Sequence, residues 1–137
     1  MSQHNSQLTP EALLDFSPYA RLIGMQLTEV DGALRISLPF QPHNIGNDQL
    51  PALHGGLIGG YMEMAAIMHL LWIRESGTVP RTVDFAIDYL RPGLARELFA
   101  ECSVTKHGQQ VANVQVSVWQ ESPEKPVAVA RAHFLLD

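Results

Sequence analysis

A carboxylate and a pair of glycines mark the stretch of this chain that is best suited to chemistry. Within residues 53–65, a His-Gly-Gly sequence at 54–56 precedes an apolar run that contains one carboxylate, Glu63. The first N–H groups of a helix lack intrahelical acceptors and carry the positive end of the dipole, and glycine lets another group approach the backbone closely. The sequence therefore predicts that an oxygen that gains negative charge would be stabilised at this helix start, and the arrangement with Glu63 looks like an active site.

The same residues also have structural explanations. Glu63 and His69 are the only acidic or basic residues between positions 55 and 73, and apolar residues surround them, so a helix there should be buried on most sides. A buried carboxylate is costly unless it is paired, protonated or solvated in a cleft. Glu63 could therefore be a core carboxylate bonded to a backbone N–H, with the glycines serving only as a tight start to the helix.

The spacing of these groups bears on how they could meet one substrate. Nine residues separate His54 from Glu63, which is roughly 13 Å of helix at about 1.5 Å per residue. A single reacting carbonyl cannot sit at the helix N-terminus and also touch Glu63 of the same helix. If both groups act on one substrate, the second must come from another copy of the chain, and a two-fold dimer with antiparallel central helices would form two equivalent sites.

The rest of the chain predicts the elements that position these groups. Thr9-Pro10 and Ser17-Pro18 are typical helix starts, and the second helix should end at Gly24. Asp31-Gly32 predicts a tight hairpin between strands at 25–30 and 33–39. A long loop is expected at 40–53, then the helix at 55–73 and strands at 82–90, 97–106, 111–120 and 127–136. In the strand at 82–90, the apolar face is expected to contain Val83, Phe85, Ile87 and Tyr89. This order predicts an α+β fold in which an antiparallel sheet wraps one long helix.

Length and composition are consistent with one compact unit. The chain has 137 residues, of which 46% are hydrophobic, so we expect a single domain over residues 9–137 after a loose tail at 1–8. The net charge of −5 argues against general nucleic-acid binding, and the charged residues inside 55–73 argue against a membrane span. The N-terminus lacks the pattern of a secretory signal, and the single cysteine, Cys102, is expected to be a buried or half-buried strand residue, so we expect a cytoplasmic protein.

Three motifs together resemble a known family. They are His54-Gly55-Gly56 with Glu63 nine residues after the histidine, the sequence Asp88 to Gly93 (DYLRPG), and Lys106-His107-Gly108. In combination they resemble the hotdog-fold acyl-CoA thioesterases related to the phenylacetate-pathway and 4-hydroxybenzoyl-CoA enzymes, over about residues 20–136. The resemblance implies a sheet curled around the long helix, a homodimer or dimer of dimers, and sites at the subunit interface.

The resemblance also implies roles for single residues. The N–H of Gly55, with Gly56 beside it, would hold the thioester carbonyl oxygen, and Glu63 of the partner subunit would act as base or nucleophile. His54 would fix the loop and donate toward the carbonyl, or would only cap the helix. Relatives often have an asparagine six residues before the histidine; that position is Asp48 here, and we favour its neighbour Asn47 for the role.

Further residues are candidates for binding substrate. Thr82 resembles a position where some relatives place a hydroxyl near the attacking water, although it could be an ordinary strand residue. Arg91, Arg96, Lys106 and His107 flank two turns that follow each other along the chain, and there they could cluster to meet the phosphates of coenzyme A or be solvated loop charges. The resemblance implies no cofactor beyond the coenzyme A of the substrate, and no spacing of Asp84, Asp88 and His133 matches a metal site.

Two other functions compete with thioester hydrolysis because one fold hosts several activities. The first is a hydratase or dehydratase, which usually shows a proline-glycine helix start and a longer spacing from histidine to carboxylate. The second is a module that binds acyl-CoA without turnover, although binding alone needs no buried acid. Acyl-chain identity stays open at this point, as does the choice between dimer and tetramer.

Overall fold

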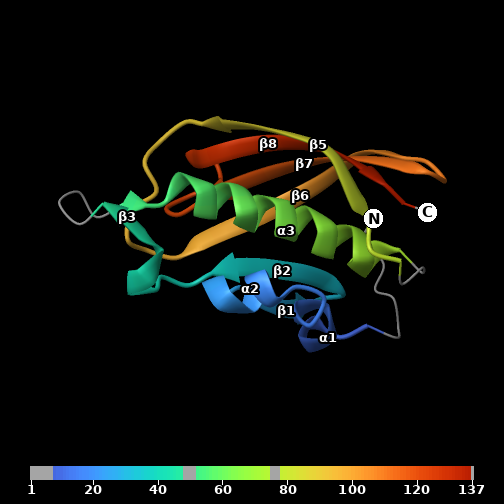
Figure 1. Cartoon of the computed structure of the whole chain (residues 1–137), viewed down its shortest axis with the longest axis horizontal. Coiled ribbons are helices and arrows are strands. Elements are labelled where there is room, and N and C mark those ends of the chain that lie inside the picture. The colour runs from blue at the N-terminus through green and yellow to red at the C-terminus, as the bar shows by residue number, and fades with distance from the viewer. Residues whose placement is uncertain (1–7, 48–51, 75–77, 137) are drawn as a thin grey trace.

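The fold is a single antiparallel sheet curved over one long helix (Figure 1). The computed structural model describes residues 8–47, 52–74 and 78–136. The helices are α1 (Pro10–Leu14), α2 (Pro18–Ile23) and α3 (Gly55–Ile73), with a 3-10 turn, η1 (Pro42–Asn44). In spatial order the sheet contains β1 (Gln26–Val30), β2 (Ala33–Leu38), β6 (Leu98–His107), β7 (Val111–Trp119), β8 (Pro126–Leu135) and β5 (Arg81–Tyr89). The predicted α+β hotdog architecture is confirmed. Of the predicted tail at 1–8, only Leu8 is described, and it packs against the core.

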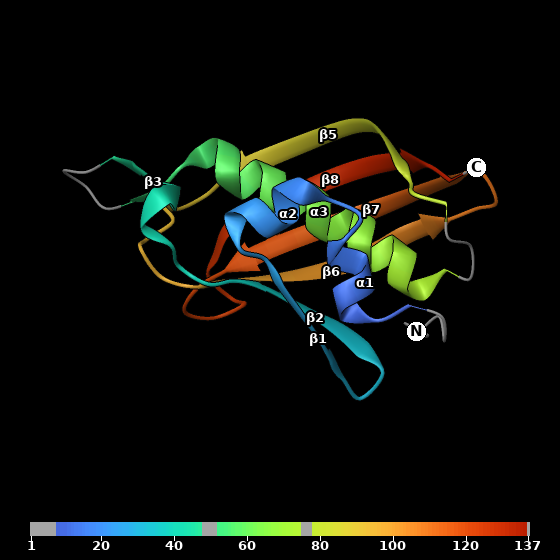
Figure 2. The ribbon, with the colours of Figure 1, turned by 60° about the horizontal axis from the view of Figure 1, so that its bottom comes forward.

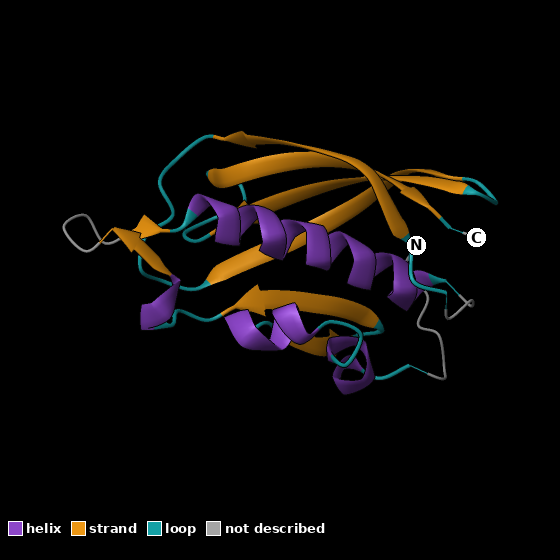
Figure 3. Ribbon diagram, in the orientation of Figure 1, coloured by secondary structure: helices purple, strands orange, loops and turns teal. Residues whose placement is uncertain are grey.

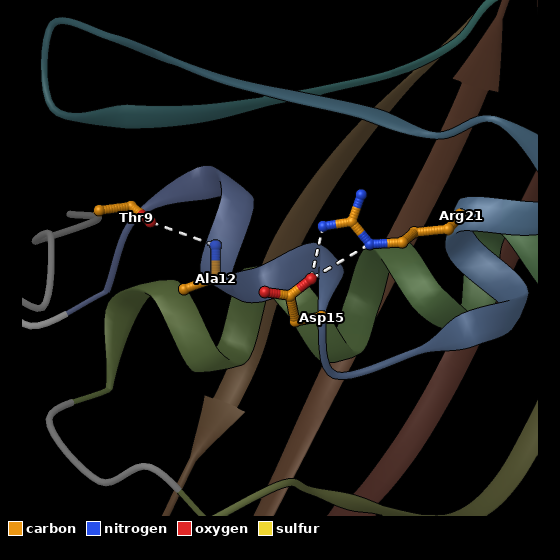
Figure 4. A network of polar contacts seen from close by, with 4 residues as sticks. All are labelled: Thr9, Ala12, Asp15 and Arg21. Carbon is orange, nitrogen blue, oxygen red and sulfur yellow. Dashed lines mark hydrogen bonds and ion pairs between the residues drawn. The ribbon is translucent and has the colours of Figure 1, made fainter.

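The two lead-in helices begin where their capping residues predicted. The Thr9 hydroxyl accepts the backbone N–H of Ala12 at 3.1 Å, and Ser17 caps α2 in the same way. Arg21 forms an ion pair with Asp15, which ties α2 to the end of α1 (Figure 4). Both helices lie against α3, and α1 also contacts β1 (Figure 2).

Backbone conformation explains the two sharp changes of direction in this first third of the chain. Gly24 ends α2 in the left-handed conformation, with φ 89°. Asp31 and Gly32 both have positive φ, at 53° and 82°, as the tight hairpin turn between β1 and β2 requires. The predictions for Gly24 and for the hairpin are confirmed.

The order of strands differs from a simple succession along the chain. β5, which follows α3, pairs with β8 at one edge of the sheet, whereas β6 lies next to β2 (Figure 3). The segment between β5 and β6 therefore crosses the end of the sheet, and the outer edge of β5 has no partner strand within the described chain. The expected long loop at 40–53 is also partly ordered, because it contains η1 and a small ribbon of β3 (Ile45–Asn47) and β4 (Ala52–Leu53).

A bulge in β5 overturns the prediction that Val83 lies on the apolar face. In the pairing with β8, Thr82 faces Phe134 and Asp84 faces His133, so Val83 is an extra residue between them. Val83 is 57% exposed, and the bulge changes which residues share a face: Thr82 now lies on the same side as Phe85 and Ile87. Strict alternation would have placed Thr82 on the opposite face.

The core lies between α3 and the inner face of the sheet. Residues buried on α3 are Leu57, Ile58, Tyr61, Met62, Ala65, Ala66, Met68, Leu70, Leu71 and Trp72. Two of them also anchor the helix by hydrogen bonds, from Tyr61 to the carbonyl of Leu98 at 3.3 Å and from Trp72 to that of Gly32 at 3.1 Å. By length and composition α3 could cross a membrane, but here it is the central helix under the sheet.

A cavity opens where β2 and β6 separate. Their pairing ends at Ile36 and Ala100, and the gap beyond it has a volume of about 500 Å³, lined among others by His69 and Cys102. Burial lowers the pKa of His69 to about 4, and burial with the nearby charge of Glu101 raises the pKa of the Cys102 thiol to about 12. Cys102 faces the core, as predicted.

The lowered pKa of His69 predicts a loss of stability in acid. His69 binds a proton near pH 6.5 in the unfolded chain and only near pH 4 in the folded chain. The contribution of neutral His69 to the free energy of unfolding is therefore complete above pH 6.5 and is lost as the pH falls toward 4. Between pH 6.5 and pH 4 the free energy of unfolding should fall more steeply in the unaltered protein than in His69→Gln. The difference should be up to about 1.4 kcal/mol per pH unit. Urea unfolding of both proteins at pH 7 and pH 4.5 measures this, and equal pH dependence would contradict it.

Candidate active site

Glu63 and Thr82 meet on the side of α3 that faces β5. The Thr82 hydroxyl donates a 2.7 Å hydrogen bond to Glu63 Oε2, and both side chains are half-buried. The contact depends on the bulge at Val83, which turns Thr82 toward the helix. The partner of Glu63 is thus a hydroxyl on the edge strand rather than a backbone N–H in the core, and Thr82 is more than an ordinary strand residue.

The start of α3 leaves the N–H of Gly55 without an acceptor among the described residues. His54 is the N-cap, and its Nδ1 accepts the N–H of Gly56 at 3.0 Å. The carbonyl of His54 accepts the N–H of Ile58 at 3.1 Å. Among the described residues nothing accepts the N–H of Gly55. The predicted donor is therefore open at Gly55, whereas the N–H of Gly56 is taken, which corrects the expectation that Gly56 also offers an N–H to substrate.

The cap defines the tautomer of His54. Because Nδ1 accepts a hydrogen bond, the proton of the neutral imidazole is on Nε2. The ring is exposed beside the open N–H of Gly55, so Nε2–H is a second available donor at this end of the helix. Capping and donation toward a carbonyl, which the sequence presented as alternatives for His54, use different ring nitrogens and are compatible.

Two residues that sequence reasoning did not assign to the site hold this helix start in place. The Tyr89 hydroxyl donates to the carbonyl of Gly55 at 2.7 Å. Asn44 is buried, donates from Nδ2 to the carbonyl of Ile23 at 3.2 Å, and accepts the N–H of His54 with its own carbonyl at 3.1 Å. Tyr89 could have been noticed as an aromatic residue in a motif already singled out. Nothing in the sequence distinguished Asn44 from the other polar residues of its loop.

A shallow pocket of about 360 Å³ adjoins the helix start and is lined by Leu53, Gly55, Ile58 and the segment from Tyr89 to Gly93, with Ala52. Arg91 lies at this pocket and donates to the carbonyl of Pro126. Lys106 and His107 do not join it. The row of paired residues that begins at Tyr89 on β5 crosses β8 and β7 and reaches Ala100 on β6. Lys106 lies six residues beyond Ala100 on β6, which is about 20 Å along the strand.

The expected cluster of Arg91, Lys106 and His107 is therefore wrong for a single chain. Successive connections between antiparallel strands lie at opposite ends of the sheet, so the turn before β6 and the turn after it cannot share one ligand group. Arg96 stays at the end of the sheet occupied by Arg91. Its backbone carbonyl is held by the side chain of Gln120 at 3.1 Å.

Two further predictions concern the loop and metals. Asn47 ends β3, and the structure defines its backbone only; Asp48 lies outside the described residues. Over the part of the chain that the structure describes, no group of three or more His, Cys, Asp or Glu side chains could hold a metal ion. Asp84 and His133 instead pair with each other.

The two halves of the site lie at different points along one strand. β5 runs antiparallel to the first half of α3: Thr82, at its start, contacts Glu63, and Tyr89, at its end, contacts Gly55 (Figure 1). Eight residues of helix, or about 12 Å, separate Gly55 from Glu63. Within one chain the open N–H and the carboxylate thus cannot act on the same carbonyl.

Comparison with known proteins defines the family. The model of the thioesterase superfamily matches residues 50–127, which is more than half of the chain. A protein of Chromobacterium violaceum with a solved structure is 50% identical, with a TM-score of 0.75, over 93% of this chain and 89% of its own. This chain belongs to the thioesterase superfamily. It is a thioester hydrolase, the class that its motifs resembled.

Individual relatives carry more specific names. The medium/long-chain acyl-CoA thioesterases YigI of Salmonella typhimurium and Escherichia coli are 26% identical to this chain, over 95% of it and 92% of their own length. A Bacillus halodurans protein solved with CoA shares the fold at 22% identity and a TM-score of 0.76, over 93% of this chain and 87% of its own.

Proposed function

We propose that the protein is an acyl-CoA thioesterase, which hydrolyses an acyl-CoA to a carboxylic acid and coenzyme A at two composite sites of a homodimer. The observation that carries the proposal is the pairing of Glu63 with the Thr82 hydroxyl on β5, in a chain where the outer edge of that strand and the N–H of Gly55 both lack a partner among the described residues. The YigI relatives and the fold shared with a CoA-bound protein support acyl-CoA as the substrate.

The proposed chemistry assigns each group one task. The carbonyl oxygen of the thioester accepts from the N–H of Gly55 and from Nε2–H of His54, which stabilise the negative charge that develops on it. Glu63 of the second copy takes a proton from water, whose oxygen attacks the carbonyl carbon, while the Thr82 hydroxyl orients that carboxylate; in the other route Glu63 attacks the carbonyl carbon itself and forms an anhydride that water then hydrolyses. The carbon–sulfur bond breaks, and the coenzyme A thiolate leaves and takes up the proton released by water.

The free edge of β5 supports a dimer of this kind. Two copies of β5 that pair antiparallel about a two-fold axis at Ala86 would bring Thr82 of each copy opposite position 89 of the other, because Val83 is the extra residue of the bulge. Glu63 of one copy would then approach the helix start of the other, because Thr82 contacts Glu63 and Tyr89 contacts Gly55. Arg91, beside that helix start, is our candidate for a coenzyme A phosphate, and the loop before α3, with Asn47, would complete the pocket.

Turnover is the direct test of the activity. The purified protein should release free thiol from acyl-CoAs, and the names of the YigI relatives make medium and long chains the first to try. A panel from acetyl to palmitoyl, with an aryl member, would define the acyl group. Thermal stabilisation by acyl-CoA without thiol release would instead support a binding module, and hydration of an enoyl-CoA would support the hydratase.

Mixing subunits tests whether the site is composite. Homodimers of Glu63→Ala and of Gly55→Pro should each keep about a hundredth of wild-type activity or less, whereas a mixed dimer keeps one site with both Gly55 and Glu63 intact. Random co-assembly should therefore restore about a quarter of wild-type activity, since half of the dimers would hold one of two intact sites. The measurement is thiol release by the mixture of the two variants co-expressed in equal amounts. An inactive mixture would show that both groups act within one chain.

A further inference from the structure

The peptide group between Gly55 and Gly56 is held at both of its polar atoms. Its carbonyl oxygen accepts the Tyr89 hydroxyl at 2.7 Å, and its N–H donates to His54 Nδ1 at 3.0 Å. The tyrosine comes from the end of β5 and the histidine from the loop before α3. Two unrelated elements therefore fix one peptide plane.

This peptide plane matters for the neighbouring donor. The free N–H of Gly55 belongs to the preceding peptide group, whose carbonyl is held by the N–H of Ile58 at 3.1 Å. The planes on both sides of the Gly55 Cα are thus anchored, so its φ and ψ cannot vary as those of a free glycine do. A donor that already points in a fixed direction stabilises developing charge without reorganisation.

Tyr89 lies over two glycines of α3. A Cβ at Gly55 would lie 3.8 Å from ring atoms of Tyr89, and one at Gly59 would lie 3.4 Å from its hydroxyl. Tyr89 is nonetheless 52% exposed, so its burial in the core does not explain its position. A second tyrosine, Tyr19, lies on Gly60 of the same helix, but its hydroxyl has no hydrogen-bond partner among the described residues.

We infer that Tyr89 is a positioning residue for the thioester carbonyl: together with His54 it clamps the Gly55–Gly56 peptide and so aims the N–H of Gly55. The inference rests on the proposed function and adds to it a residue that acts through the donor rather than on the substrate.

The test combines Tyr89→Phe with a change at the donor. Tyr89→Phe keeps the ring and removes the hydroxyl, so kcat should fall about 3- to 10-fold with little change in KM, as expected for one neutral hydrogen bond. Tyr19→Phe is the matched control and should leave kcat unchanged. In Gly55→Pro, which has no N–H to aim, Tyr89→Phe should cause no further fall, because the two changes act on the same interaction. Melting temperatures of all variants check the fold.

The outcomes separate the inference from the function on which it rests. An unchanged kcat in Tyr89→Phe, or an equal fall in both backgrounds, would overturn the positioning role while leaving the hydrolase intact. An absence of hydrolysis by the unaltered protein would overturn the proposed function itself. A fall confined to the background with an intact Gly55 supports both.

Discussion

Replacing Glu63 with glutamine should lower kcat for acyl-CoA hydrolysis by roughly 10²- to 10⁴-fold, the range expected when a general base is removed. The amide has nearly the shape of the carboxylate, and its oxygen can still accept the Thr82 hydroxyl, so the fold should persist. The amide cannot take a proton from water or attack a carbonyl. Thiol release under substrate saturation, compared with the melting temperature of the same sample, measures the effect.

Two controls make the Glu63 result specific. Glu101→Gln removes an equal charge from an exposed residue of β6 and should leave kcat near that of the unaltered protein. Thr82→Val keeps the shape of the side chain but removes the hydroxyl, and should lower kcat less than Glu63→Gln does. Near-normal turnover by Glu63→Gln would end the assignment of this carboxylate.

Substituting proline for Gly55 should cost roughly 10²- to 10³-fold in kcat, as expected when one backbone donor to a developing oxyanion is lost. Gly55 is the first residue of α3, where proline is well tolerated because its N–H is not needed by the helix. His54 has φ −63° and ψ 131°, an extended conformation that suits the residue before a proline. The substitution therefore removes the proposed donor with little expected change to the fold.

Gly55→Ala is the matched control for this experiment. It adds a methyl group 3.8 Å from the Tyr89 ring, an ordinary contact, and it keeps the N–H. Activity of Gly55→Ala well above that of Gly55→Pro would assign the loss to the donor. Equal loss in both variants would point to crowding of the site, and full activity of Gly55→Pro would exclude the Gly55 N–H as the carbonyl donor.

Local signals in the sequence predicted most of the fold. Capping residues located α1 and α2, Asp31-Gly32 located the first hairpin, and the apolar run from Gly55 to Ile73 matched the bounds of α3. The place of β5 at the sheet edge could not be derived in this way, because the pairing of strands distant in sequence depends on the whole sheet. The assumed cluster of Arg91 with Lys106 failed for the same reason.

Part of the candidate site was also within reach of the sequence. The glycine pair, Glu63 and Thr82 were found by residue type, by spacing and by resemblance to a family. The contact of Glu63 with Thr82 needed the bulge at Val83, which simple alternation does not reveal. The hydrogen bond from Tyr89 to Gly55 joins residues 34 positions apart, so no local sequence pattern predicts it.

The extra residue in β5 also changes how relatives should be compared with this chain. In a homologue whose strand lacks the bulge, the residue aligned with Thr82 would point to the opposite face of the sheet. The hydroxyl that meets the helix carboxylate of that homologue would then be one position away in its sequence. An alignment without a gap would then score such a homologue as having lost the residue. A search of this family for the hydroxyl should therefore count positions from the strand pairing rather than from the sequence alone.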